Sequence, residues 1–118
     1  MAVHVQNITF DCDDTAKVGA FWSGALGRAI DPSPNEYIHT IGMTDGELPR
    51  WFFLKVPEGK TAKNRMHLDL GADDRETEVA RLVELGATRV ADKDEWGIKW
   101  TVMQDPEGNE FCVSSGAG

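Results

Sequence analysis

The sequence predicts an α+β fold built from two successive copies of one unit, which is a strand, a helix and several further strands. Residues 7–14 and 67–74 are both strand-like, end in Asp-Asp and lie 60 positions apart. Each is followed by apolar residues at helical spacing and then by short strand-like segments between turn residues. A chain of 118 residues has room for one core. We therefore expect a single domain over residues 1–118, with modules at about 3–58 and 63–115.

Two helices follow from the spacing of apolar residues. The first is expected over residues 16–25, where Val18 and Phe21 fall on one helical face, and the second over residues 76–85, where Val79, Leu82 and Val83 do so. Both segments end in Leu-Gly. Glycine readily takes the left-handed conformation that commonly closes a helix, so both ends are well defined.

An acidic pair precedes each expected helix. A carboxylate at this point accepts hydrogen bonds from free backbone amides and interacts favourably with the positive end of the helix dipole. Asp73 and Glu76 also have the spacing of a capping box. We therefore assign Asp13, Asp14, Asp73 and Asp74 to structure and not to catalysis.

The remaining strands are expected between segments rich in proline, glycine, asparagine and aspartate. Proline fixes φ in such turns, and glycine or asparagine accepts positive φ. The expected strands after the two helices are residues 37–43, 51–56, 99–104 and 110–115.

Composition excludes several classes of partner. The chain has 20 acidic and 12 basic residues and a net charge of −8, which opposes nucleic acid and anionic membrane surfaces. The N-terminus lacks a secretory pattern and the chain lacks a long apolar run, so a cytoplasmic protein is expected. Cys12 and Cys112 are expected to be buried free thiols, with a disulfide as the alternative.

Three motifs in order resemble the vicinal-oxygen-chelate superfamily, which includes glyoxalases, bleomycin-resistance proteins and dioxygenases. Asp14, Phe-Trp at 21–22 and Leu-Gly at 26–27 resemble its first-helix signature. The runs KNRMHLD at 63–69 and DPEGNEFCV at 105–113 resemble the second module of its glyoxalase-like domain branch. The resemblance implies tandem βαβββ modules that form two curved mixed sheets around a pocket, and a homodimer.

The resemblance also implies where a metal would bind, because metal-dependent members carry a ligand on the first and last strand of each module. Those positions hold Asn7, His67, Cys112 and one of residues 52–54, so one clear ligand of four remains. A metal-free site is therefore expected, and no cofactor. The alternative is a divalent metal at His67 and Cys112, with Asp69 as a third ligand.

Strand alternation predicts which side chains face the pocket. Met66, Leu68 and Leu70 should pack under a helix, and Phe111 and Val113 should join the core. The opposite face should carry the candidate site. Its predicted members are Asn7, Thr9, Arg65, His67, Asp69, Cys112 and Ser114, with Trp51, Trp96 and Trp100 as aromatic walls.

Most of these residues also have a structural interpretation. Arg65 is expected to pair with Asp69, two positions along the same face, with anchoring of an anionic substrate as the alternative. The tryptophans could instead be core or dimer-interface residues. His67 could be a structural or surface residue as well as an acid–base group. His4 and His39 are left unassigned and are expected to be exposed.

The sequence leaves three kinds of function open. The first is a metal-independent lyase, isomerase or dehydratase that acts on a small metabolite, with His67 and Asp69 as catalytic residues. The second is a drug- or metabolite-binding protein without chemistry. The third is a structural or regulatory domain with a vestigial pocket. Metal-dependent glyoxalase or extradiol dioxygenase activity is not expected, because both require ligands that this chain lacks.

Overall fold

The computed structural model describes residues 2 and 4–115. The chain divides between residues 60 and 61 into two compact units, each described separately below as a module. The predicted start of the first module at position 3 lies outside the described residues. No helix in the described part of the chain is long and apolar enough to span a membrane.

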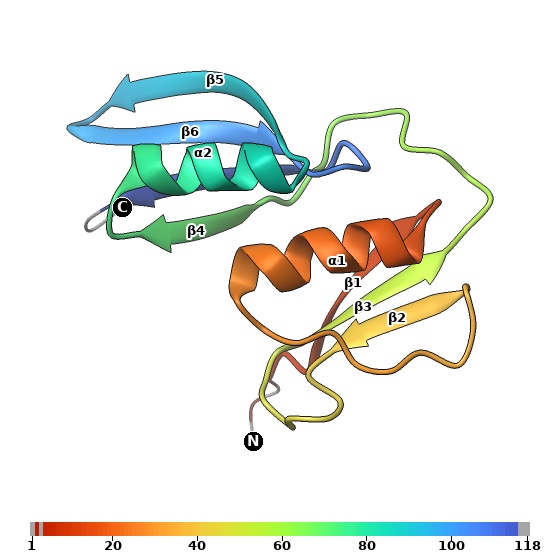
Figure 1. The fold of residues 1–118 in the computed structure, drawn as a ribbon. Coiled ribbons are helices and arrows are strands. Elements are labelled where there is room, and N and C mark those ends of the chain that lie inside the picture. Colours follow the sequence, from red (N-terminus) through yellow and green to blue (C-terminus); the bar gives the residue numbers. More distant parts are fainter. Residues whose placement is uncertain (1, 3, 116–118) are drawn as a thin grey trace. The chain divides into compact units, whose positions relative to one another are not determined.

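The first module contains a three-stranded sheet and one helix (Figure 1). Strand β1 (Asn7–Cys12) pairs in parallel with β3 (Arg50–Lys55), and β2 (Ile38–Ile41) pairs antiparallel with the other edge of β3. Helix α1 (Thr15–Leu26) packs on β2 and β3.

The second module repeats this arrangement and adds a strand (Figure 1). Strand β4 (Leu68–Ala72) pairs in parallel with β7 (Glu110–Ser115), and β6 (Ile98–Gln104) runs antiparallel to β7. Strand β5 (Thr88–Glu95) forms the far edge. Helix α2 (Arg75–Leu85) contacts all four strands.

The predicted repeat is reproduced residue by residue. Thr9 lies opposite Phe52 in the first module, and Asp69 lies opposite Cys112 in the second, so both members of the pair are displaced by 60 positions. The fold is therefore α+β with two tandem modules and mixed sheets, as predicted.

The helix ends agree with the predicted N-cap aspartates and C-cap glycines, Gly86 of α2 included, and differ at one point. Asp14 accepts a hydrogen bond from the Lys17 amide at 3.0 Å, and Asp74 accepts one from Thr77. Gly27 closes α1 with φ of 66°. The predicted capping box at Asp73 and Glu76 is wrong, because the N-cap is the next residue, Asp74.

Aromatic side chains form the core of the first module. Trp22 and Phe53 are fully buried, and Trp51 is 5% exposed. The Trp51 ring lies 5.2 Å from Trp22 and 5.8 Å from Phe10, measured between centroids. In the second module, Phe111 and Val113 are buried as predicted.

One expected strand of the first module is reduced to a single bridge. The repeat places a counterpart of β5 after α1, but there Ile30 forms only an isolated bridge with Ile41. Pro32 and Pro34 follow directly. Because proline has no backbone N–H, it interrupts a hydrogen-bonded ladder.

Strand β5 was not predicted from the sequence, because its residues are mostly charged and do not alternate. It forms a long hairpin with β6 that contains a bulge between Arg89 and Ala91. The extra residue shifts the alternation, so Arg89 and Asp92 both lie on the face covered by α2.

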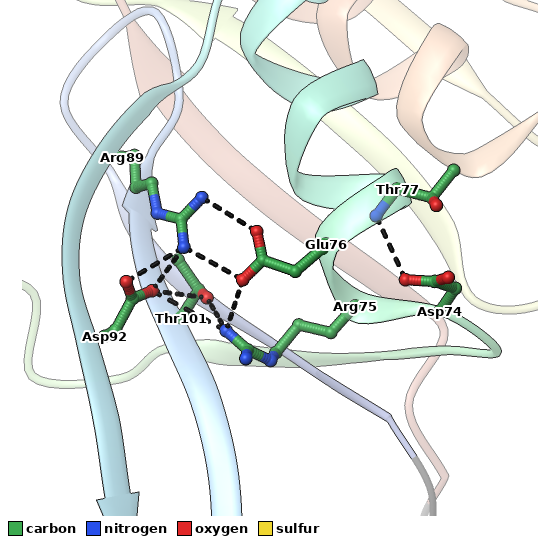
Figure 2. Close-up of polar contacts among 7 residues, drawn as sticks. All are labelled: Asp74, Arg75, Glu76, Thr77, Arg89, Asp92 and Thr101. Atoms are coloured by element: carbon green, nitrogen blue, oxygen red, sulfur yellow. Dashed lines mark hydrogen bonds and ion pairs between the residues drawn. The ribbon is translucent and has the colours of Figure 1, made fainter.

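A polar network on this face joins α2 to the hairpin (Figure 2). Arg89 bonds both carboxylate oxygens of Asp92, at 2.8 and 2.9 Å, and also bonds Glu76. The buried Thr101 hydroxyl donates to Asp92 at 2.9 Å and accepts from Arg75 at 2.7 Å. The network fixes β5 to β6 and to the start of α2.

Candidate functional site

The face of the second sheet opposite α2, called here the open face, carries several of the polar residues predicted for a site. On β6 and β7 the residues that pack under α2 alternate with residues that face away from it. The latter are half-buried. The open face includes Asp69, Gly71, Trp100, Val102, Cys112 and Ser114.

Three chemically active side chains gather on this face. The ligand atoms of His67, Asp69 and Cys112 all lie within 4.8 Å of one another. Asp69 and Cys112 are partners on adjacent strands, and His67 precedes β4. The sequence analysis predicted that these three would share a face.

A hydrogen bond sets the orientation of the His67 ring. Its Nδ1 lies 3.0 Å from Oδ1 of Asp69. An ionised carboxylate only accepts, so the Nδ1–H donates and the neutral ring keeps its lone pair on Nε2. The His67 side chain is 48% exposed, so a ligand in solvent can reach it.

The thiol of Cys112 remains protonated around neutral pH. Burial raises its pKa, and the negative charge of Asp69 raises it further, against a smaller opposite effect of Lys63. The thiolate is the nucleophilic and metal-binding form of cysteine. Cys112 is therefore a neutral, polarizable wall of the site and not an activated nucleophile.

The arrangement of donors does not fit the metal site that the resemblance implies. In the first module the counterparts of His67, Asp69 and Cys112 are Asn7, Thr9 and Phe52, which provide no imidazole, carboxylate or thiolate. The second module offers three donors, in His67, Asp69 and Cys112, but these do not reproduce the expected pattern of one ligand on the first and last strand of each module.

The remaining predicted residues lie in different surroundings. Asn7 and Thr9 are exposed on the sheet of the first module, and Trp51 belongs to the core of that module. Ser114 and Trp100 are partners on the open face. Trp96, in the β5–β6 turn, lies nearly parallel to Trp100.

Two predictions about side chains near His67 are wrong. Met66 is 74% exposed, because β4 begins only at Leu68 and strand alternation does not extend back to it. Among the described residues, Asp69 pairs with His67 and not with Arg65. The His67 ring lies 3.0 Å from the carboxylate of Asp69, and both His67 and Arg65 precede β4.

A residue that no sequence pattern indicates, Glu110, holds the chain before His67. The backbone N–H of Asn64 donates to the Glu110 carboxylate at 2.9 Å, and its side-chain amide donates to the Glu110 carbonyl. The two residues are 46 positions apart, so no local pattern indicates the contact. Glu110 is a positioning residue.

His39, which was expected to be exposed, is half-buried in the first module. Its Nδ1 lies 2.7 Å from the Thr15 hydroxyl, which donates to the carbonyl of Glu36. The hydroxyl hydrogen is therefore used, and His39 Nδ1–H must donate. This histidine has a structural role.

Fold and site together define a small α+β protein of two tandem modules with a polar cluster on one sheet. The family model described as a glyoxalase-like domain matches residues 7–114. The chain belongs to this family, as the sequence motifs indicated.

Solved structures share the fold at low sequence identity. A glyoxalase/bleomycin resistance protein/dioxygenase family enzyme from Burkholderia phytofirmans PsJN has a TM-score of 0.75 and 18% identity, over 96% of this chain and 98% of that one. A fosfomycin resistance protein from Mesorhizobium loti has a TM-score of 0.74 and 13% identity, over 99% and 95%. A lactoylglutathione lyase from Agrobacterium tumefaciens has a TM-score of 0.68 and 15% identity, over 98% and 95%. No curated protein sequence matches the chain.

Proposed function

We propose that the second module binds a small metabolite on its open face and that His67 transfers a proton there without a metal or other cofactor. The observation that carries this proposal is the 3.0 Å contact between His67 Nδ1 and Asp69. This contact fixes the orientation of the imidazole ring and leaves Nε2 free to act as the base. Asp69 is a positioning residue in this scheme.

The exposure of the pair supports a chemical role over a structural one. The side chains of His67 and Asp69 are 48% and 71% exposed. Ion pairs in such surroundings contribute about 0–1 kcal/mol to stability. A surface carboxylate that orients an imidazole therefore gains little for folding and is better suited to acid–base catalysis.

The proposed reaction class is a lyase, isomerase or dehydratase. The form of these reactions proposed here begins when His67, as the base, removes a proton from carbon. In an isomerase the proton returns to another atom of the substrate. In a lyase or dehydratase the electron pair left behind expels a leaving group, which His67 can protonate as it returns to the neutral form.

A synthetic substrate tests the basic capacity of His67 without knowledge of the metabolite. In 5-nitro-1,2-benzisoxazole a base takes the proton from C3, the N–O bond breaks and a cyano-nitrophenolate is released, which is coloured. General acid–base catalysis contributes about 10²–10⁴-fold in evolved sites. With this unnatural substrate we expect a rate at least about tenfold above buffer.

Variants assign that rate to a side chain. His67→Gln should lower it to that of buffer, and Asp69→Asn should lower it in part, because the ring is no longer oriented. His4→Gln is the matched control, because His4 is an exposed histidine outside the sheets. Equal rates for wild type and His67→Gln would show that His67 is not the base.

A second candidate is a drug- or metabolite-binding protein without chemistry, which the exposed Trp96 favours. It predicts that ligands bind but are recovered unchanged. In that case wild type and His67→Gln should bind a ligand equally well. The benzisoxazole should then react with either protein at the rate measured in buffer alone.

The metal-free site, the cytoplasmic location and the homodimer are proposals of the same kind. Elemental analysis of protein purified without added metal should find less than stoichiometric transition metal, and one equivalent would overturn this part. Light scattering after size exclusion should give twice 13.0 kDa for a homodimer.

A further inference from the structure

The turn between β5 and β6 has an unusual residue at its centre. Trp96 and Gly97 connect the paired residues Glu95 and Ile98, and both have positive φ, at 55° and 74°. Two-residue turns of this kind favour Asn-Gly. Positive φ is unfavourable for a bulky side chain, because Cβ crowds the following carbonyl. Folding alone therefore does not account for tryptophan at this position.

The indole of Trp96 is also largely in water. The residue is 85% exposed, the highest exposure among the large hydrophobic side chains of the described chain. Its ring plane lies only 11° from that of Trp100, with centroids 6.3 Å apart. The two indoles are therefore held nearly parallel, while most of the Trp96 surface has no protein partner.

Trp100 connects this pair to the open face. It lies opposite Ser114 on β7 and opposite Lys93 on β5. Cys112, a member of the polar cluster, is two residues from Ser114 on the same strand and the same face. The aromatic surface of Trp96 and Trp100 and the acid–base pair of His67 and Asp69 thus belong to the same side of one sheet.

We propose that Trp96 and Trp100 form a stacking site for the flat aromatic ring of a small-molecule ligand. Parallel indoles present faces to which another aromatic ring stacks, and the strained position of Trp96 keeps its ring at the edge of the sheet. This stacking site adds a class of ligand to the proposed function. It rests on the proposed function only because that function places the ligand on the open face. The polar groups of the ligand then lie toward Ser114 and Cys112.

A matched pair of neutral compounds tests the requirement for a flat ring. We would titrate 2-naphthalenemethanol and its saturated counterpart, decahydro-2-naphthalenemethanol, into 15N-labelled full-length protein. The four tryptophans give four indole N–H signals. The signals of Trp96 and Trp100 should move with the aromatic compound, and those of the buried Trp22 and Trp51 should not. The saturated compound should move none of them at equal concentration.

Variants separate binding from folding. Trp96→Asn should weaken binding of the aromatic compound at least about fivefold, because a stacking surface is lost. The Trp100 signal reports this affinity. The Tm of this variant should equal or exceed that of wild type, because asparagine tolerates positive φ. Trp96→Phe should restore part of the affinity. A Tm several degrees below wild type for Trp96→Asn would assign Trp96 to the fold and overturn the proposal.

Two further outcomes would also overturn it. Equal shifts with the aromatic and the saturated compound would mean that the surface is merely hydrophobic. Indole shifts that depend on protein concentration without ligand would mean that a second copy of the chain covers Trp96. Loss of proton transfer in His67→Gln with unchanged naphthalenemethanol binding would confirm both proposals separately, because the two experiments have different readouts.

Discussion

Replacing Thr101 with valine tests whether the polar network of the second module stabilises the fold. Thr101 is fully buried, and its hydroxyl both donates to Asp92 and accepts from Arg75. Valine has a similar size but no hydroxyl. Two hydrogen bonds to charged groups would contribute about 3–6 kcal/mol together if neither partner had another contact.

Both partners do have other contacts, which lowers this figure. Asp92 remains paired with Arg89, and Arg75 remains 3.2 Å from Glu76. The added methyl group also gains about 0.8 kcal/mol from burial. We therefore expect Thr101→Val to lower the free energy of unfolding by about 2 kcal/mol.

Urea denaturation followed by circular dichroism measures this loss. With an m value of about 1–3 kcal/mol per M, the midpoint should fall by about 1 M. The matched control is Thr101→Ser, which keeps the hydroxyl and loses one methyl group, at a cost of about 1 kcal/mol. If Thr101→Val is as stable as Thr101→Ser or more stable, the network does not stabilise the module as argued.

Other predictions concern acid, the helix caps and the thiol. Hydrogen bonds from Arg89 and Thr101 lower the pKa of Asp92 in the folded protein. Its contribution to stability is therefore complete above the unfolded pKa of about 4 and is lost as pH falls through the lower folded pKa. The urea midpoint of Asp92→Asn should fall less than that of wild type between neutral and acidic pH. Asp14→Ala and Asp74→Ala should each cost about 1 kcal/mol in urea unfolding, because each removes an N-cap, and an unchanged midpoint would contradict the cap. Cys112 should react with iodoacetamide more slowly than a free thiol at pH 8, and Asp69→Asn should accelerate it, because one cause of the raised pKa is removed; mass spectrometry locates the modification.

The parts of the fold that depend on local chemistry could be predicted from the sequence. Helix ends are such a case, because an aspartate at the start and a glycine at the end act on amides and carbonyls within four residues. Strand β5 could not be predicted, because an edge strand that is held by ion pairs to α2 has no apolar alternation. The bulge beside Arg89 is likewise visible only once β6 is its neighbour.

The candidate site was predictable to the same limited extent. Alternation along β4 and β7, together with the offset of the repeat, placed His67, Asp69 and Cys112 on one face. The choice of His67 over Arg65 as the partner of Asp69 depends on the path of the chain before β4, which the sequence does not indicate. The contact from Asn64 to Glu110 joins two distant segments and needed the structure.

The 60-residue offset between the two modules gives each position in one module an equivalent position in the other. The N-cap residue of the helix is the same in both copies, Asp14 in the first and Asp74 in the second. Positions on the exposed sheet faces have diverged, as with Thr9 and Asp69. Exchanging a pair of equivalent residues that differ between the copies therefore asks a different question from an ordinary substitution: an exchange of Thr9 and Asp69 should move a carboxylate from the second module to the first and keep the composition of the chain.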